Sequence, residues 1–226
     1  MTPAQQSDRA LELCRMAPVI PVIVVDDLSQ ARPLAEALVA GGLPVLEVTL
    51  RTECALQAIA AMAEVPGAVV GAGTVLSAAH MSAAKDAGAT FAVSPGATPA
   101  LIDAARVEGV PLLPGAQTCS EVMALLGQGY HVQKFFPAES IGGAGALKSI
   151  GGPLPQVTFC PTGGITPELA PGYLGLANVA CVGGSWVSPK GLMQAGDWAQ
   201  ITDIARAAAG LARSSDIRGR GGAGQS

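Results

Sequence analysis

The sequence predicts an α/β fold, a (β/α)8 TIM barrel, formed by a single domain with a short N-terminal helix. Half of the 226 residues are apolar and only 13% are charged. Parallel strands that are covered on both faces read as continuous Val/Ile/Leu runs, and this chain has such runs. Eight of them alternate with Ala- and Leu-rich helical stretches, and this repetition predicts closure into a barrel. A doubly wound open sheet is the alternative, but eight similar units favour the barrel.

The eight predicted strands are short and rich in Val and Ile. They span residues 19–25, 44–50, 68–75, 90–95, 111–116, 131–137, 156–162 and 179–185. Residues 1–15 are polar and compatible with a helix, and residues 197–213 have the pattern of a closing amphipathic helix. We therefore expect the domain to span 1–213. Residues 214–226 are expected to be a flexible tail, because this Gly-rich, charged segment has nothing to bury.

Composition excludes several classes of function. A net charge of -4 gives no electrostatic footprint for nucleic acid or for an anionic membrane. No apolar stretch is long enough to span a bilayer, and the start of the chain lacks the pattern of a signal peptide, so the cytoplasm is the expected location. The cysteines follow no CxxC or Cys/His spacing and indicate reduced thiols rather than a metal site. They are Cys14, Cys54, Cys119, Cys160 and Cys181.

Lys134 is the one lysine of four that falls inside a predicted strand. Burying an unpaired ammonium is costly, and a neutral lysine amine can attack a ketone to form a Schiff base. A lysine at a strand end can also extend to solvent or form a structural ion pair. Position alone does not decide between a nucleophile and a structural lysine.

The strand at residues 44–50 supplies a second indication. A period of two places Glu47 and Arg51 on one face and an aliphatic set on the other, so we expect Glu47 and Arg51 to point into the barrel. Glu47 could complete a structural ion-pair network or shuttle protons for Lys134. Arg51, near the strand end, suits bidentate recognition of a substrate carboxylate.

Two glycine pairs lie where barrels of this class often bind phosphate, after the seventh and eighth strands. Gly163 and Gly164 precede Thr166 and Pro167, which are expected to be the N-cap and first residue of a helix. The eighth strand ends in a second pair followed by Ser185, and such glycines let backbone N–H groups approach an anion.

Several segments together resemble the 2-keto-3-deoxy-6-phosphogluconate (KDPG) aldolase and 4-hydroxy-2-oxoglutarate (KHG) aldolase family. These segments are GLPVLEVTLRTE (42–53), VGAGTV (70–75), SPG (94–96), KFFPAE (134–139), FCPTGGI (159–165) and GGSW (183–186). The resemblance runs from about residue 18 to residue 212 in family order. It implies a class I aldolase without a metal or other cofactor, which cleaves a phosphorylated keto acid to pyruvate and glyceraldehyde 3-phosphate, and which is typically a homotrimer.

The resemblance also implies roles for individual residues. Lys134 matches the lysine that forms the Schiff base, and Glu47 matches the proton acceptor and donor. Arg51 and Thr74 match the residues that hold the pyruvate carboxylate. Gln133 departs from the apolar residue usual before the lysine, but it should face the helix layer or solvent, away from Lys134.

The remaining matches concern the rest of the substrate. Thr162 matches the residue that influences the stereochemistry of the aldehyde, while Phe136 and Pro95 match residues lining the pyruvyl pocket. The matches to phosphate-binding positions are Gly163, Gly164, Gly184 and Ser185.

Three alternatives stay open. The nearest is an enzyme of the same class that prefers 2-dehydro-3-deoxy-6-phosphogalactonate or mainly 4-hydroxy-2-oxoglutarate. The second is a phosphate-binding barrel without Schiff-base chemistry, such as a thiamine-phosphate-synthase-like enzyme or an isomerase. The third is a sugar-phosphate sensor on an inactivated barrel. The combination of Lys134, Glu47 and Arg51 argues against the last two.

Overall fold

A computed structural model describes residues 1–212 of the chain. The predicted tail, residues 214–226, lies outside the described residues. The nine strands fall within the eight predicted runs. Their bounds are β1 Val19–Ile23, β2 Val45–Thr49, β3 Val69–Gly73, β4 Ala92–Val93, β5 Leu112–Leu113, β6 Gly115–Ala116, β7 Val132–Phe135, β8 Thr158–Pro161 and β9 Val182–Gly184.

Helices precede, connect and follow the strands along the described chain. They are α1 Pro3–Met16, α2 Ala31–Ala40, α3 Ala55–Ala63, α4 Ala78–Asp86, α5 Pro99–Glu108, α6 Cys119–Gly127, α7 Gly143–Gly151, α8 Ala170–Leu174, α9 Lys190–Ala195 and α10 Trp198–Ala209. Short 3-10 helices occur at η1 Leu28–Gln30 and η2 Glu139–Ile141. The predicted N-terminal and closing helices are confirmed as α1 and α10, while the short α9 was not predicted.

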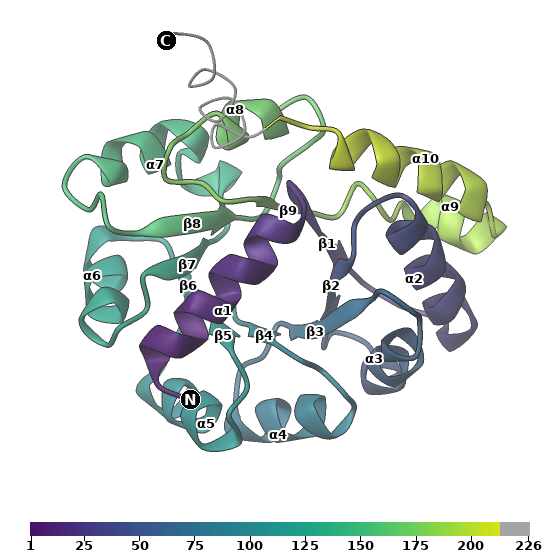
Figure 1. The fold of residues 1–226 in the computed structure, drawn as a ribbon, viewed down its shortest axis with the longest axis horizontal. Helices are drawn as coiled ribbons and strands as arrows, with labels where there is room; N and C mark the ends of the chain where they lie inside the picture. The colour runs from purple at the N-terminus through teal and green to yellow at the C-terminus, as the bar shows by residue number, and fades with distance from the viewer. Residues whose placement is uncertain (213–226) are drawn as a thin grey trace, which may run out of the picture.

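The strands pair in parallel and form two sheets. The larger has the order β5-β4-β3-β2-β1-β9 and the smaller β6-β7-β8. Isolated parallel bridges, Phe159 with Val179 and Thr162 with Gly183, connect β8 to the segment around β9. Figure 1 shows the strands curving around a shared interior with the connecting helices outside. Because all pairs are parallel, the carboxyl ends of the strands meet at one end of this interior.

The fifth predicted strand, residues 111–116, is split into β5 and β6 by Pro114. Proline has no N–H to donate to a ladder, although its carbonyl oxygen still accepts from the Lys134 N–H at 2.8 Å.

The helix start predicted at Thr166 and Pro167 is wrong, because α8 begins only at Ala170. Pro171 explains the difference. Its missing N–H and its ring would break a helix already running from Pro167, whereas proline is tolerated in a first turn.

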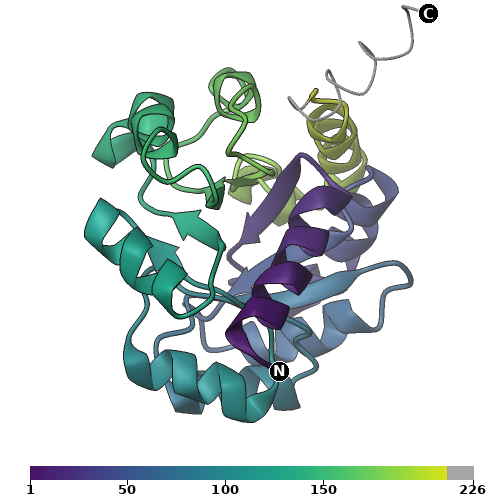
Figure 2. The ribbon, with the colours of Figure 1, turned by 60° about the vertical axis from the view of Figure 1, so that its left-hand side comes forward.

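Helix α1 lies across the end of the interior opposite the carboxyl ends, in contact with β5 and β7 (Figures 1 and 2). A Thr2 capping box starts the helix, and its buried face carries Gln6 and Ser7. Gln6 Oε1 accepts from the Tyr130 hydroxyl at 2.8 Å, and Ser7 Oγ accepts from the Val132 N–H at 2.7 Å. The helix thereby satisfies polar groups near the start of β7 that would otherwise be buried without partners.

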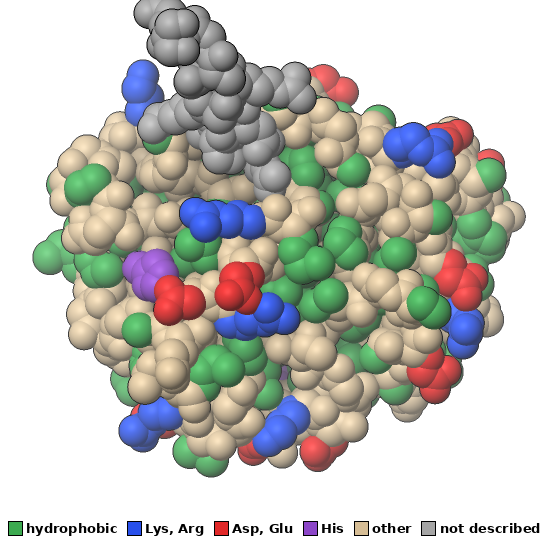
Figure 3. Space-filling model, in the orientation of Figure 1, with side chains coloured by type: hydrophobic (Ala, Val, Ile, Leu, Met, Phe, Trp, Pro, Cys, Tyr) green, Lys and Arg blue, Asp and Glu red, His purple; other side chains and the backbone are tan. Residues whose placement is uncertain are grey.

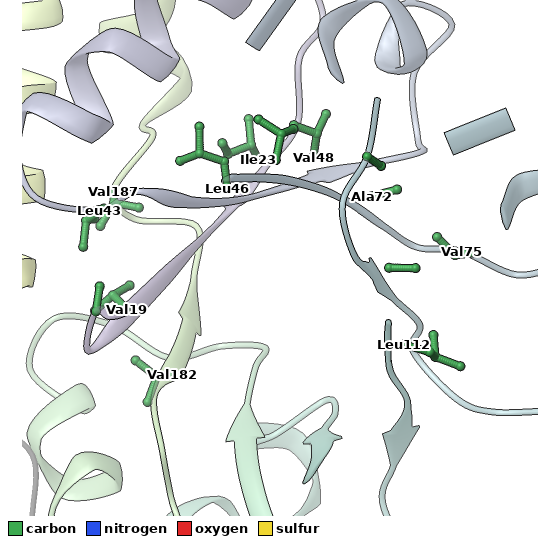
Figure 4. Packing of buried hydrophobic residues seen from close by; sticks show 14 of the residues in the cluster. Val19, Ile23, Leu43, Leu46, Val48, Ala72, Val75, Leu112, Val182 and Val187 are labelled. Carbon is green, nitrogen blue, oxygen red and sulfur yellow. The ribbon is translucent and has the colours of Figure 1, made fainter. Parts of the chain in front are cut away.

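The buried apolar side chains form two clusters separated by the sheet. The outer cluster lies between strands and helices, and Figure 4 shows part of it, with Ile23, Leu46 and Val48 close together. The inner cluster lies between the strands and α1, and includes Val45 and Phe91. This division confirms the predicted register of β2, whose consecutive residues Val45 and Leu46 enter different clusters.

The face of the molecule in Figure 3 carries charges of both signs. On this face, acidic and basic side chains are interspersed among apolar ones. Within residues 1–212, none of the helices combines the length and apolar character needed to cross a membrane.

Gly41 tests the packing of α2 against α10. A Cβ at Gly41 would lie 2.4 Å from Ala205 Cβ and 2.8 Å from the Thr202 carbonyl oxygen. We expect Gly41→Ala to lower the free energy of unfolding by about 1–3 kcal/mol through overpacking. The control Gly145→Ala, in α7 with open space at its Cβ, should raise it by about 0.5–1 kcal/mol. Urea denaturation measures both, and equal effects would contradict the packing argument.

Candidate active site

A buried lysine and a buried glutamate meet inside the curved sheet. Lys134 Nζ lies 3.2 Å from Glu47 Oε1, and the two residues are only 4% and 3% exposed. Lys134 comes from β7 and Glu47 from β2, 87 residues apart in the sequence. The predicted inward orientation of Glu47 is therefore confirmed, and the partner that it meets is Lys134.

Small neighbours make room for this pair. Gly73, which ends β3, has no side chain, and a Cβ there would lie 2.4 Å from Glu47 Oε1. Lys134 pairs in register with Gly115 on one side and Cys160 on the other. Its ammonium also lies 5.2 Å from the centre of the Phe136 ring, within range of a cation–π contact.

Burial raises the pKa of the Glu47 carboxyl, because the charged form loses its hydration. The positive charge and hydrogen bond of Lys134 act in the opposite direction, as does Arg51 more weakly. The pKa nevertheless stays above its ordinary value. A carboxyl of this kind exchanges its proton more readily near neutral pH than an exposed one, which suits a general acid and base.

The strand pattern predicted that Arg51 points into the barrel, and this prediction is wrong. Arg51 lies in the turn after β2, where it is exposed. The strand ends at Thr49, so the period of two no longer applies at Arg51. Arg51 Nε donates to Thr74 Oγ1 at 3.1 Å, and Thr74 adopts the left-handed conformation with φ 57°. This places a cation and a hydroxyl together at the mouth of the site.

A pocket of about 140 Å³ opens above Lys134 at the carboxyl ends of the strands. Seven of the predicted site residues line it: Arg51, Lys134, Phe136, Thr162, Gly163, Gly164 and Ser185. Its other lining residues are Val22, Val24, Ile165 and Gly183. A larger cleft of about 760 Å³ adjoins it at Val22, Val24 and Ser185, which extends the space available to a ligand.

The backbone after β8 turns sharply at the pocket wall. Gly163 and Gly164 have φ values of 105° and 77°, a conformation that side chains rarely adopt. Thr162 is buried beside them, and within the described structure its hydroxyl oxygen has no hydrogen-bond partner. A Cβ on Gly183 would lie 2.3 Å from that oxygen, so glycine is needed for the two strands to approach here.

Four predicted site residues do not line the pocket: Glu47, Thr74, Pro95 and Gly184. Glu47 contacts Lys134 beneath the pocket, and Thr74 accepts a hydrogen bond from Arg51 at its mouth. Pro95 lies against β6, where a Cβ on Gly115 would meet its backbone at 2.3 Å, and Gly184 packs under the Trp186 ring. Sequence reasoning missed Val22, Val24 and Ile165. Their apolar character is equally typical of a core residue, so no sequence signal distinguished them.

Gln133 lies on the far side of β7 from the pocket, as its register predicted. Its side-chain amide donates to the carbonyl oxygens of Val122, in α6, and Tyr130. The residue therefore anchors the strand to the helix layer and takes no part in the pocket.

The site thus combines a buried amine in the pocket wall, a proton-exchanging carboxyl directly beneath it and a cation at the mouth. This set can capture a keto acid as a Schiff base. The sequence matches the family described as "Aldolase: KDPG and KHG aldolase" over residues 11–204. The chain belongs to this aldolase family.

Individual relatives of the family are similar over most of their length. The 2-dehydro-3-deoxy-phosphogluconate aldolase of Zymomonas mobilis is 55% identical over 88% of this chain and 94% of the relative. The KHG/KDPG aldolase of Escherichia coli K12 is 55% identical over 84% and 90%. A crystal structure of KDPG aldolase from Legionella pneumophila, with pyruvate captured at low pH as a covalent carbinolamine intermediate, superposes with a TM-score of 0.86 at 47% identity, covering 88% of this chain and 97% of that one.

The raised pKa of Glu47 predicts a pH-dependent contribution to stability. The folded state holds this proton more tightly than the unfolded chain, so the contribution is full below the ordinary value of 4.5 and is lost as the pH rises through the raised pKa. Glutamine cannot titrate. The free energy of unfolding of the wild type minus that of Glu47→Gln should therefore fall as the pH rises above 4.5. Urea denaturation at several pH values measures this difference, and one that rises with pH would contradict the assignment.

Proposed function

We propose that this aldolase uses Lys134 to cleave 2-dehydro-3-deoxy-6-phosphogluconate to pyruvate and glyceraldehyde 3-phosphate. The chain is a class I carbon–carbon lyase, as its 55%-identical relatives with KDPG aldolase names indicate. The observation that carries the assignment of the nucleophile is the 3.2 Å contact between Lys134 and Glu47 beneath the pocket. It supplies an amine and a proton carrier at one place.

The reaction begins when the neutral Lys134 amine attacks the C2 ketone of the substrate. The carbinolamine that forms loses water to give an iminium, and Glu47 lies close enough to supply and receive the protons of these steps. The carbinolamine in the Legionella structure shows that a family member forms such an adduct with pyruvate.

Cleavage then uses the iminium as an electron sink. Glu47, directly or through a water molecule, takes the proton of the C4 hydroxyl, the C3–C4 bond breaks, and the aldehyde leaves. The electron pair of that bond remains as an enamine on Lys134. Glu47 returns the proton to C3, and water hydrolyses the resulting pyruvyl iminium to free pyruvate and the amine.

Both ends of the substrate carry negative charge, and the pocket offers a site for each. We assign the pyruvate carboxylate to Arg51 and Thr74, which hydrogen-bond to each other at the mouth. Thr162, whose hydroxyl has no hydrogen-bond partner within the described structure, is assigned to the C4 hydroxyl of the substrate. The orientation of this hydroxyl distinguishes the gluconate substrate from its galactonate epimer. Phe136 and Pro95 are assigned to the apolar wall beside the pyruvyl methylene. The phosphate is assigned to Gly163, Gly164, Gly184 and Ser185.

The proposal extends to a second substrate, 4-hydroxy-2-oxoglutarate, cleaved to pyruvate and glyoxylate. The name of the E. coli relative includes this activity. The galactonate-pathway epimer is the competing substrate, and a comparison of the cleavage rates of the two C4 epimers decides between them. A phosphate-binding barrel without Schiff-base chemistry has no use for a lysine that is 4% exposed beside a glutamate.

We propose further that the two sheets close a complete (β/α)8 barrel. With β5 and β6 taken as one strand, the pairings and the bridges between β8 and β9 connect eight strands in a ring. A single domain over residues 1–213, a homotrimer as the assembly and the cytoplasm as the location are parts of the same proposal. The five cysteines, all free in the structure, suit a reducing compartment.

Trapping with borohydride tests the nucleophile. Incubation with pyruvate and borohydride should add a stable pyruvyl mass to the peptide containing Lys134, detected by mass spectrometry. Lys134→Ala should give no adduct and background turnover, while Lys148→Ala, which removes an exposed lysine of α7, should behave like the wild type. An adduct on Lys85, Lys148 or Lys190 would reject the proposal.

Ser185 tests the phosphate site. A hydrogen bond to a charged group contributes about 1.5–3 kcal/mol, so Ser185→Ala should raise KM for the phosphorylated substrate about 10-fold or more. KM for unphosphorylated 4-hydroxy-2-oxoglutarate should stay the same, which makes that substrate the internal control. Steady-state assays with both substrates measure the two KM values. An equal rise in both would contradict the assignment of Ser185 to the phosphate site.

A further inference from the structure

Three buried thiols meet at the end of the interior that α1 covers, away from the pocket. Cys14 comes from α1, Cys160 from β8, and Cys181 immediately precedes β9. Their sulfur atoms all lie within 4.8 Å of one another, and those of Cys160 and Cys181 are 3.5 Å apart. The residues are 1%, 3% and 0% exposed.

The sequence spacing gives no indication of this cluster, because 146 residues separate Cys14 from Cys160. The fold brings them together in two ways. The bridges between β8 and the segment around β9 place Cys160 near Cys181, and α1 delivers Cys14 from across the opening (Figure 1). The cluster shares the inner core with apolar side chains that include Leu13, Ile20 and Val132.

The arrangement matches the dimensions of a three-sulfur metal site. With metal–sulfur bonds of about 2.3 Å, the sulfurs of a trigonal site lie about 4.0 Å from one another. The Cys160–Cys181 separation of 3.5 Å and the upper limit of 4.8 Å on the other two sulfur–sulfur separations are compatible with this distance. Small shifts of side chains suffice for all three sulfurs to contact one ion.

The donor set selects the ion. Within residues 1–212, these cysteines form the sole group of three or more His, Cys, Asp or Glu ligand atoms so close together, and no fourth such side chain joins them. Structural zinc takes four ligands, whereas an all-thiolate set with three donors suits monovalent copper. The adjoining cavity of about 10 Å³, lined mostly by apolar side chains, is poorly suited to a water molecule as a fourth ligand.

The charge around the cluster favours deprotonation of one thiol. Hydrogen bonds from Cys14 and Cys181 lower the pKa of Cys160, and the positive charge of Lys134 acts in the same direction. Cys160 is the register partner of Lys134 on the neighbouring strand. The pKa values of Cys14 and Cys181 are raised by their hydrogen bonds within the cluster and by burial, so a metal ion has to displace those two protons to bind all three sulfurs as thiolates.

We propose that Cys14, Cys160 and Cys181 form a binding site for one Cu⁺ ion, held inside the fold beneath the aldolase pocket. Each thiol that binds the ion releases its proton to solvent. The cysteines take no part in the proposed steps of the aldol reaction, so the copper proposal does not rest on the proposed function, although the charges of Lys134 and Glu47 act on the cluster.

Titration with Cu⁺ tests the site. The background protein is Cys54→Ala/Cys119→Ala, which removes the exposed Cys119 thiol and the half-buried Cys54 thiol outside the cluster. Under anaerobic, reducing conditions, Cu⁺ is added in competition with the chromophoric chelator bathocuproine disulfonate. We expect one tightly bound Cu⁺ per chain and an X-ray absorption spectrum with three sulfur neighbours.

Variants of the cluster provide the comparison. Cys14→Ala, Cys160→Ala and Cys181→Ala in that background should each weaken Cu⁺ binding at least 10-fold. Cys14→Ala leaves every strand unchanged, and circular dichroism verifies that it folds. The proposal is overturned if the background protein binds no Cu⁺ against the chelator, if folded Cys14→Ala binds it as tightly, or if X-ray absorption shows nitrogen or oxygen neighbours instead of sulfur.

Discussion

The contact between Lys134 and Glu47 is the constraint around which the interior is organised. A charged group that is almost fully excluded from water is stable only with a partner, and a single partner from a distant strand restricts where both strands can lie. The contact spans β7 and β2, which belong to different sheets, and so relates the two sheets to each other. The contact also suits proton transfer. Burial makes the charged forms of both groups less stable, and this favours exchange of a proton between the Glu47 carboxyl and the Lys134 amine.

Space inside the curved sheet is the second constraint. Inward positions alternate between large and absent side chains: Gly71 receives the Phe91 ring, Gly73 receives Glu47, and Gly183 receives Thr162. A methyl group at any of these glycines would meet a neighbour at 2.5 Å or less. Side chains therefore fill the interior at these glycines, and the pocket above Lys134 lies at the carboxyl ends of the strands.

The two ends of the interior have different physical characters. At the carboxyl ends, loops with left-handed glycines and the exposed Arg51 leave the pocket open to solvent. At the opposite end, α1 satisfies strand groups through Gln6 and Ser7 and brings Cys14 to two other thiols. The polar, charged end suits an anionic substrate, whereas the apolar, sulfur-rich end suits a soft ion.

The sequence by itself determined the strand order, most of the helices and the inward register of Glu47, because local hydrophobic periodicity follows directly from which face is buried. It singled out Lys134 as the lysine inside a strand, but the role of Lys134 as the nucleophile stays a prediction. It misplaced Arg51 and the start of α8, since strand ends and proline effects depend on the path of the chain beyond the periodic segment. Only the tertiary structure decided which side chains meet. Three features join residues far apart in the chain: the Lys134–Glu47 contact, the apolar wall formed by Val22 and Ile165, and the three-cysteine cluster. A local sequence pattern does not indicate which distant residues meet.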